Sequence, residues 1–424
     1  MEVSLRQMSM SQRLSFLSEN FDLTEIELGL LRGKGMSTDI AENLIENSIG
    51  YFPIPLGLAT HFHIDGRDVL VPMAVEESSI IAACSAAAKW IRKEGEITTA
   101  TVGNLIIGQI QLPQVKSVAE ATARLTARKA ELIDAANAML PGLVARGGGV
   151  RELGFRDVPR ADGTGHMLVI HVLCDPCDAM GANLINQVCE GLKPKVQEIS
   201  EEEVGLCILS NLVDSKLATA QVRLRNIDTE LGQGIVEAML FAESDPYRAT
   251  THNKGVLNGI DPILIATGND WRAVEAGIHA YASRSGRYQP VTSWKMEGSD
   301  LVGRIELPMA LGTVGGVTRI HPFAKIALKI LKIEHADELA RICAAVGLVQ
   351  NLAALKALST VGIVRGHMEL HAANLALAAG STTDEIPWVR KKLLELIKQK
   401  KNIGISVAQD ILRELRAQAL ELKG

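Results

Sequence analysis

The fold is organised around the stretch from Asp245 to Tyr281, DPYRATTHNKGVLNGIDPILIATGNDWRAVEAGIHAY. This stretch carries an arginine, a lysine and an aspartate, Arg248, Lys254 and Asp270, among glycines and apolar residues. Because glycines and small polar residues surround the lysine, we expect Lys254 to lie on a permissive loop. The apolar run at 262–266 predicts a buried strand, and a helix is expected from about 271 to 283.

The three charged residues of this stretch have ordinary explanations as well as catalytic ones. An aspartate directly before a helix is a preferred N-cap, which accounts for Asp270 without any chemistry. A loop lysine is commonly solvated, which accounts for Lys254. The residues themselves leave both interpretations open.

A different pattern occupies residues 106–210. A strand at 106–112, a long helix at 117–139, strands near 150 and at 167–173, a helix at 179–192 and a strand at 205–209 follow one another. This is the βαββαβ order of the ferredoxin-like arrangement. We therefore expect an α+β protein, in which a large mixed helix and sheet domain (1–105 and 211–379) contains this inserted small domain (106–210).

The remaining segments complete the expected architecture. Residues 9–45 predict short helices, residues 56–64 and 69–74 predict two strands joined by a turn, and an alanine-rich helix begins near Ile80. Glu76 and Glu77 precede that helix, where acidic residues favour the helix dipole. A carboxylate between a buried strand and a buried helix would also suit a general acid. The tail, 380–424, predicts a small helical flap.

Composition excludes several classes of function. The net charge of −5 gives no reason to expect nucleic acid or an anionic membrane as a partner, and aromatics make up only 4%. We find no apolar run near the roughly 18 residues of a membrane span and no secretory signal, so we expect a soluble cytoplasmic protein. The six cysteines are expected to be reduced core thiols.

Two short motifs suggest metal or redox chemistry. Cys174 and Cys177 have CxxC spacing before a helix, but a second CxxC is missing, so structural cysteines are favoured over zinc or redox sites. His367 and His371 share one helical face in an H-x-E-x-H pattern, without an obvious third ligand. We expect no metal, and His367 suits general acid work better.

The second helix of the small domain begins with Asp178-Ala-Met-Gly-Ala-Asn183. Asp178 can cap this helix, and Gly181 leaves room for a ligand near the free N–H groups, as in a phosphate site. No G-x-G-x-x-G occurs, so a dinucleotide would bind by a fold other than the Rossmann fold.

Six motifs together resemble one family closely. Residues 46–50 (ENSIG), 75–77 (VEE), 178–183 (DAMGAN), 251–255 (THNKG), 268–270 (GND) and 366–368 (GHM) occur in the order and spacing of 3-hydroxy-3-methylglutaryl-CoA (HMG-CoA) reductases. The likeness covers essentially the whole chain and points to the soluble bacterial class II. It implies a four-electron, NAD(P)-dependent interconversion of HMG-CoA with mevalonate and free CoA.

The resemblance also implies roles for individual residues. Lys254 would stabilise the oxyanion, Glu77 would donate the proton to the alkoxide, and His367 would protonate the departing thiolate. Asp270 would hydrogen-bond both Lys254 and Glu77. The substrate contacts would come from Arg248, Ser79, Asn211 and Asn258, and the cofactor contacts from Asp178, Met180, Gly181 and Asn183.

Members of this family form dimers or dimers of dimers with the active site at the subunit interface, so we expect the same here. Ser48 and Ser78 depart from common family residues. NADH-using relatives carry an acidic residue where this chain has residues 138–141 (AMLP), and Arg146 lies a little beyond. Since an arginine can accept a 2′-phosphate, NADH and NADPH both stay open.

Two rival functions remain at the level of sequence. One is a non-catalytic or retuned CoA-ligand-binding paralogue that has kept the fold, and retention of all four candidate catalytic residues argues against it. The other is an oxidoreductase of a different acyl-CoA. Arg248 discriminates here, because a substrate without a free carboxylate would leave that cation unpaired.

Overall fold

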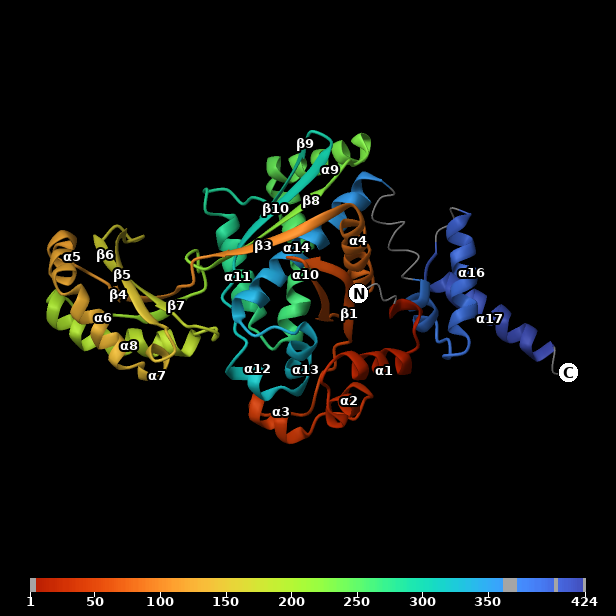
Figure 1. Ribbon diagram of the computed structural model, residues 1–424, viewed down its shortest axis with the longest axis horizontal. Coiled ribbons are helices and arrows are strands. Elements are labelled where there is room, and N and C mark those ends of the chain that lie inside the picture. The colour runs from red at the N-terminus through yellow and green to blue at the C-terminus, as the bar shows by residue number, and fades with distance from the viewer. Residues whose placement is uncertain (1–4, 361–371, 400–402, 422–424) are drawn as a thin grey trace.

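The computed structural model describes residues 5–360, 372–399 and 403–421. Two separate sheets organise them, with helices around each (Figure 1). The large sheet has the strand order β2-β1-β3-β8-β10-β9 and the small sheet the order β5-β6-β4-β7. This mixture of helix and sheet confirms the expected α+β class.

The large sheet is antiparallel except where β1 meets β3. Along β8, buried and half-buried residues alternate, so one face of the sheet is turned towards the core. The large-sheet strands are β1 (Leu56–Ile64), β2 (Arg67–Ala74), β3 (Gly95–Val102), β8 (Leu217–Leu224), β9 (Thr292–Glu297) and β10 (Asp300–Pro308).

One long helix fills the core of this unit. α14 (Ala336–Ser359) packs against strands β3, β8 and β10 and against three helices. Those helices are α4 (Ile80–Glu94), α9 (Thr229–Ser244) and α10 (Pro246–Ala266). By length and composition alone, α14 is apolar enough to cross a membrane, although polar residues such as Gln350 and Asn351 interrupt its apolar sequence. Most of its residues are buried, as is usual for the core helix of a globular protein.

The small sheet has the strand order of a ferredoxin-like fold, and its three pairings are all antiparallel. Figure 1 shows it to one side of the large sheet. Its elements are β4 (Ile106–Leu112), α5 (Val118–Ala127), α6 (Lys129–Ala138), α7 (Pro141–Val144), β5 (Gly149–Pro159), β6 (His166–Asp175), α8 (Ala182–Ser200) and β7 (Cys207–Ser210).

The helix pattern of the small sheet differs from our expectation at two places. The single helix expected at 117–139 is two helices, α5 and α6, divided at Arg128, whose backbone (φ −113°, ψ 20°) is not helical. α8 begins at Ala182 rather than residue 179, because the preceding Gly181 adopts a left-handed conformation (φ 90°). A residue in that conformation cannot be part of a regular right-handed helix, so α8 can begin only after Gly181.

The remaining helices lie near the two ends of the chain and between residues 271 and 331. They are η1 (Leu5–Gln7), α1 (Met10–Asn20), α2 (Glu25–Leu31), α3 (Thr38–Leu44), α11 (Trp271–Ala282), α12 (Gly316–Ile320), α13 (Pro322–Leu331), α16 (Ile386–Lys398) and α17 (Ile405–Glu421). The last two lie apart from the large sheet in Figure 1 and share a hydrophobic cluster of their own, with Leu375, Val389 and Leu412 among its members.

The stretch that we expected to form a loop and a strand is one continuous helix. α10 carries Lys254 on its surface, and residues 262–266 are its last turns. The expected loop around Lys254 and the expected strand at 262–266 were both wrong, and the reason is the packing of α10 against α14. A Cβ at Gly259 would lie 2.9 Å from the carbonyl oxygen of Val346 on α14, so this glycine allows two core helices to approach closely. A short apolar run does not distinguish a strand from a buried helix.

Candidate active site

The site is assembled around a contact between Lys254 and Glu77. The Nζ atom of Lys254, on α10, lies 3.4 Å from Oε2 of Glu77, in the turn before α4. Both side chains keep access to solvent, with 63% of the lysine side chain and 43% of the glutamate side chain exposed. An ammonium group and a carboxylate therefore meet on an open surface, where a substrate can reach both.

Asp270 takes a different position from the one we expected. Its carboxylate accepts the N–H of Ala273 at 3.2 Å, which makes it the N-cap of α11, and it lies 3.1 Å from the guanidinium of Arg272. Among the described residues, no hydrogen bond or ion pair joins Asp270 to Lys254 or Glu77. Its capping function is thus confirmed, and the expected three-residue contact is only partly assembled.

Two expected substrate-binding residues lie on the same helix as Lys254. Asn258 is half-buried four residues after Lys254, which places it on the same helical face. Arg248 is half-buried nearer the start of α10, and burial lowers the pKa of its guanidinium. A partly desolvated cation attracts an anionic ligand more strongly than one in bulk water.

The other two expected substrate-binding residues lie at the ends of other elements. Ser79 precedes α4 with φ 85°, a conformation that non-glycine residues rarely adopt and that concentrates at functional sites. Asn211 directly follows β7 and is exposed. A Cβ at Gly277 of α11 would lie 2.5 Å from its carbonyl oxygen, so α11 packs closely on this residue.

A buried polar network anchors α10 beside the lysine. The Nε2 atom of His252 lies 2.6 Å from the hydroxyl of Thr292 and 3.1 Å from Nδ2 of Asn351. The indole N–H of Trp294 donates to Oδ1 of Asn351 at 2.8 Å, and an indole nitrogen can only donate. This fixes the orientation of the Asn351 amide, whose NH₂ group must donate to Nε2 of His252.

The network keeps His252 neutral. Since Nε2 accepts a hydrogen bond, the ring proton lies on Nδ1, which is buried without a partner among the described residues. Burial, together with the nearby charge of Arg248, lowers the pKa of His252 to about 3. Next to it, Asn253 donates to the carbonyl of Gln289 at 2.9 Å and accepts the N–H of Val291 at 3.0 Å. Two consecutive residues thus fix the turn of α10 that presents Lys254.

This network was not predicted from the sequence. The signal that could have revealed it is in the stretch from Asp245 to Tyr281, where the polar residues His252 and Asn253 directly precede Lys254. We assigned them to a loop, in which neither would be buried.

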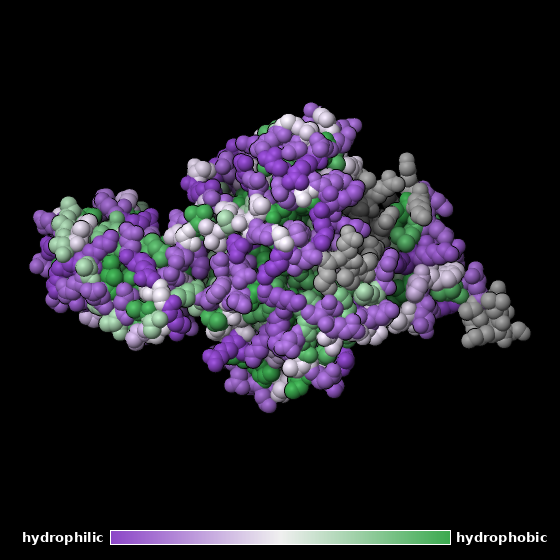
Figure 2. All heavy atoms as spheres, viewed as in Figure 1, coloured by the Kyte–Doolittle hydropathy of each residue, from purple (hydrophilic) through white to green (hydrophobic). Residues whose placement is uncertain are grey.

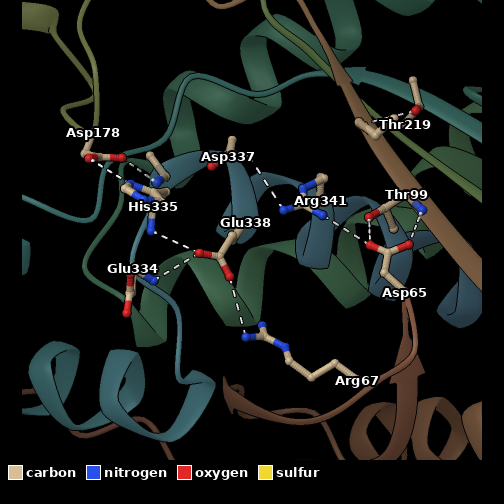
Figure 3. A network of polar contacts seen from close by, with 12 residues as sticks. Asp65, Arg67, Thr99, Asp178, Thr219, Glu334, His335, Asp337, Glu338 and Arg341 are labelled. Carbon is tan, nitrogen blue, oxygen red and sulfur yellow. Dashed lines mark hydrogen bonds and ion pairs between the residues drawn. The ribbon is translucent and has the colours of Figure 1, made fainter. Parts of the chain in front are cut away.

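The residues of the expected cofactor loop also differ in part from expectation. Asp178 does not cap α8. Its Oδ1 accepts the N–H of Ala336 at the start of α14 at 2.9 Å, and its Oδ2 lies 3.3 Å from Nδ1 of His335 (Figure 3). A Cβ at Gly181 would collide with the side chain of Ile106, so packing as well as backbone conformation requires this glycine. Met180 is half-buried and Asn183 is exposed.

The start of α8 suits an anionic group. No side chain caps this 19-residue helix, so its first N–H groups have no side-chain acceptor. The carboxylate of Asp178 accepts an N–H of α14 instead, so it does not occupy the first N–H groups of α8. A pyrophosphate is the kind of group that such a terminus binds.

The two motifs considered for metal or redox chemistry have different outcomes. Four of the six cysteines are buried as core residues, whereas Cys177 and Cys207 are half-buried. Burial raises the pKa of Cys174 to about 12 and also raises that of Cys177, whereas a redox CxxC needs a lowered pKa. His367 and His371 lie outside the described residues, so the structure adds nothing on them.

Comparison with known proteins identifies the family. Residues 9–372 match the family model described as hydroxymethylglutaryl-coenzyme A reductase. The chain belongs to the HMG-CoA reductase family. A reductase from Archaeoglobus fulgidus is 44% identical over 414 residues, covering 97% of this chain and 93% of that protein. A probable HMG-CoA reductase from Borreliella burgdorferi is 33% identical over 89% of this chain and 88% of that protein.

Solved HMG-CoA reductases share the fold. One from Streptococcus pneumoniae has a TM-score of 0.81 at 38% identity and covers 97% of this chain and 100% of its own. A class II enzyme from the same organism, bound to NADPH in open conformations, has a TM-score of 0.81 at 39% identity over 84% of this chain and 100% of its own. The family expected from six motifs is thereby confirmed, and with it an oxidoreductase whose family substrates are HMG-CoA, CoA and mevalonate.

Proposed function

We propose that this chain uses NADH or NADPH to interconvert HMG-CoA with mevalonate and CoA, with Lys254 and Glu77 at the reacting carbonyl. One observation carries this assignment. Lys254 and Glu77 lie 177 residues apart in the sequence, yet their charged groups meet at 3.4 Å on an accessible surface. An ammonium group beside a carboxyl group provides what a carbonyl reduction needs, namely a cation for the developing oxyanion and, in the protonated form of the carboxyl group, a proton donor.

We assign the following roles to the chain's own residues. The Nζ atom of Lys254 holds the negative charge that develops on the thioester oxygen, and later on the aldehyde oxygen. Glu77 gives its proton to the alkoxide. Asp270 orients this pair from the start of α11 and reaches them when substrate is bound. His367 protonates the departing thiolate, as the family resemblance implies.

Substrate recognition follows from charge and position. HMG-CoA carries a free carboxylate, and we assign it to Arg248, whose half-buried guanidinium can form a bidentate pair. Ser79, Asn211 and Asn258 supply polar contacts. Of these, Asn258 lies on the same face of α10 as Lys254, so one helix contributes to both recognition and chemistry.

When bound, the dinucleotide supplies the hydride. Asp178, Met180, Gly181 and Asn183 form the loop that would hold it, with the free N–H groups of α8 facing its pyrophosphate. The NADPH-bound relative supports this class of cofactor, and the choice between NADH and NADPH is a matter for assay.

We further propose a division of the chain into functional units. Residues 1–105 and 211–379 form the substrate-binding domain, 106–210 the dinucleotide-binding domain and 380–424 a flap. Separate hydrophobic clusters support the three units. Leu375 and Ala376, just before the flap, pack in the same cluster as α16 and α17.

The expected oligomer is a homodimer, or a dimer of dimers, with its active sites at the subunit interface. Exposed apolar side chains support an interface beside the ENSIG motif. Ile49 and Phe52 are exposed almost completely. The face of the molecule drawn in Figure 2 is mainly hydrophilic. We place the protein in the cytoplasm, which suits its six free cysteines.

A direct assay tests this function. Purified protein is mixed with HMG-CoA and either NADH or NADPH, and the loss of absorbance of the reduced nicotinamide is followed. Acetyl-CoA serves as the matched control, because it has the thioester but no free carboxylate for Arg248. Turnover with acetyl-CoA comparable to that with HMG-CoA would contradict the assignment of Arg248, and no turnover with either nicotinamide would contradict the function.

A further inference from the structure

The loop that leads into α8 is attached to the large-sheet unit through Asp178. Its carboxylate accepts the N–H of Ala336 and lies 3.3 Å from the imidazole of His335, and its carbonyl accepts the N–H of Thr313 at 2.9 Å. Figure 3 shows the carboxylate of Asp178 directed at His335, at the start of α14. A single aspartate therefore joins the small-sheet unit to the central core helix.

The surroundings of this contact are rich in acids. A cavity of about 290 Å³ at the junction is lined by Asp175, Asp178, His335, Asp337 and Lys216. Lys216 is only 9% exposed, and burial lowers the pKa of its ammonium group against the opposite effect of the three aspartates. Asp337 and Glu338, on α14 itself, also face His335. Lys216 offsets part of the repulsion between these carboxylates and Asp178, and a charged His335 offsets more of it.

We propose that His335 is a positioning residue, whose protonated ring holds Asp178, and with it residues 176–181, against the start of α14. The proposal rests on the function above, in which those residues form the dinucleotide-binding loop. His335 touches neither substrate nor dinucleotide in this assignment. It sets the place of the loop, and hence of the free N–H groups of α8.

The charge of the ring decides the strength of this contact. The hydrogen bond to Asp178 is the largest of the effects that raise the pKa of His335 above its ordinary value. The folded chain therefore favours the charged ring, and the ring loses its charge as the pH rises through this raised pKa. The bond from Ala336 to Asp178 does not titrate, so the loop is loosened at high pH rather than released.

Two substitutions separate charge from shape. His335→Gln removes the charge, and His335→Lys keeps a charge over the whole working range. The Michaelis constant for the reduced dinucleotide is measured from pH 6.5 to pH 9, and each variant is expressed as a ratio to the wild type, which cancels the titration of the dinucleotide itself. His63→Gln is the matched control, because His63 forms a similar exposed pair with Asp68 at 2.8 Å, away from the cofactor loop.

For His335→Gln we expect a Michaelis constant about two- to fivefold above the wild type at pH 6.5, the range typical of an exposed ion pair, and a ratio near one at pH 9. For His335→Lys we expect a ratio near one at pH 6.5 and below one at pH 9. A ratio for His335→Gln that does not change with pH would overturn the proposal, because a purely structural loss would persist at every pH.

A second measurement does not depend on activity. Amide hydrogen exchange in residues 176–183 should be faster in His335→Gln than in the wild type at pH 6.5, and the two should converge at pH 9 after correction for intrinsic exchange. Equal exchange at pH 6.5 would overturn the proposal. If the wild type oxidises neither nicotinamide with HMG-CoA, the proposed function fails, while the exchange experiment still decides whether His335 holds the loop.

Discussion

Lys254 and Glu77 approach to 3.4 Å from two elements that are neighbours only in the folded chain, α10 and the turn before α4. The contact is not a buried ion pair, since both side chains are substantially exposed. Such exposed pairs contribute little to stability, about 0–1 kcal/mol. We therefore explain the proximity of Lys254 and Glu77 by their proposed role in catalysis rather than by a contribution to the stability of the fold.

The first prediction concerns Lys254. Lys254→Ala should lower kcat by about two to three orders of magnitude, because it removes the cation beside the developing oxyanion. Its urea unfolding midpoint should stay within error of the wild type. Lys89→Ala, at an exposed position of α4, is the control and should retain full turnover. If Lys254→Ala kept near-normal kcat, the oxyanion role would have to be given to another group.

The family, the two-sheet architecture and most elements could be predicted from the sequence, because their signals are local. Motifs such as DAMGAN are short, and the βαββαβ order depends on strand and helix patterns. The structure of α10 could not be predicted in this way. Gly255 and Gly259 indicate a loop when read locally, and only the closeness of α14 explains Gly259 as a helix-packing position. Similarly, Asp178 looks like the cap of its own helix, whereas it caps α14, 158 residues away.

A second prediction concerns the network behind Lys254. Asn351→Ala leaves Trp294, Thr292 and His252 without their shared partner, so the free energy of unfolding should fall by about 2–4 kcal/mol. We expect kcat to fall as well, since His252 directly precedes the turn that carries the lysine. Urea denaturation and steady-state kinetics measure the two effects.

Gln350→Ala is the control for this network. Gln350 is the preceding residue on α14 and is also buried, but its side-chain oxygen has no partner among the described residues. Its removal breaks no hydrogen bond of that oxygen and should cost less stability than Asn351→Ala. Equal losses in the two variants would mean that the polar network contributes nothing beyond packing.

A third prediction follows from a pair of acids between α10 and α11. Burial, and then the charge of Glu275, raise the pKa of Asp261 from 3.8 to about 8. The folded chain therefore holds this proton more tightly than the unfolded chain does. As pH rises from about 4 to about 8, the unfolded chain releases the proton first, so the free energy of unfolding should fall by up to about 1.4 kcal/mol per pH unit.

Asp261→Asn tests this dependence. The variant has no proton to lose, so its unfolding free energy should decline less over the same range and should exceed that of the wild type at pH 8. Urea midpoints at pH 5, 6.5 and 8 provide the measurement. Glu237→Gln, at an exposed position of α9, should follow the wild type throughout. Parallel curves for Asp261→Asn and the wild type would show that Asp261 titrates normally.

The last prediction concerns the glycine at the start of α8. Gly181→Ala has two separate costs, since its φ of 90° is unfavourable for alanine and its Cβ would collide with Ile106 on β4. Gly163→Ala isolates the first cost, because Gly163 has a φ of 73° and nothing within 4 Å of its Cβ position. Gly163→Ala should therefore lower the free energy of unfolding by only about 1 kcal/mol and leave kinetics unchanged.

Gly181→Ala should lower the free energy of unfolding clearly more than that and should also raise the Michaelis constant for the dinucleotide. Relief of the collision must move either β4 or the loop that orients the free N–H groups of α8. Equal stability losses in the two variants, with unchanged kinetics in both, would mean that the contact with Ile106 does not set the position of this loop.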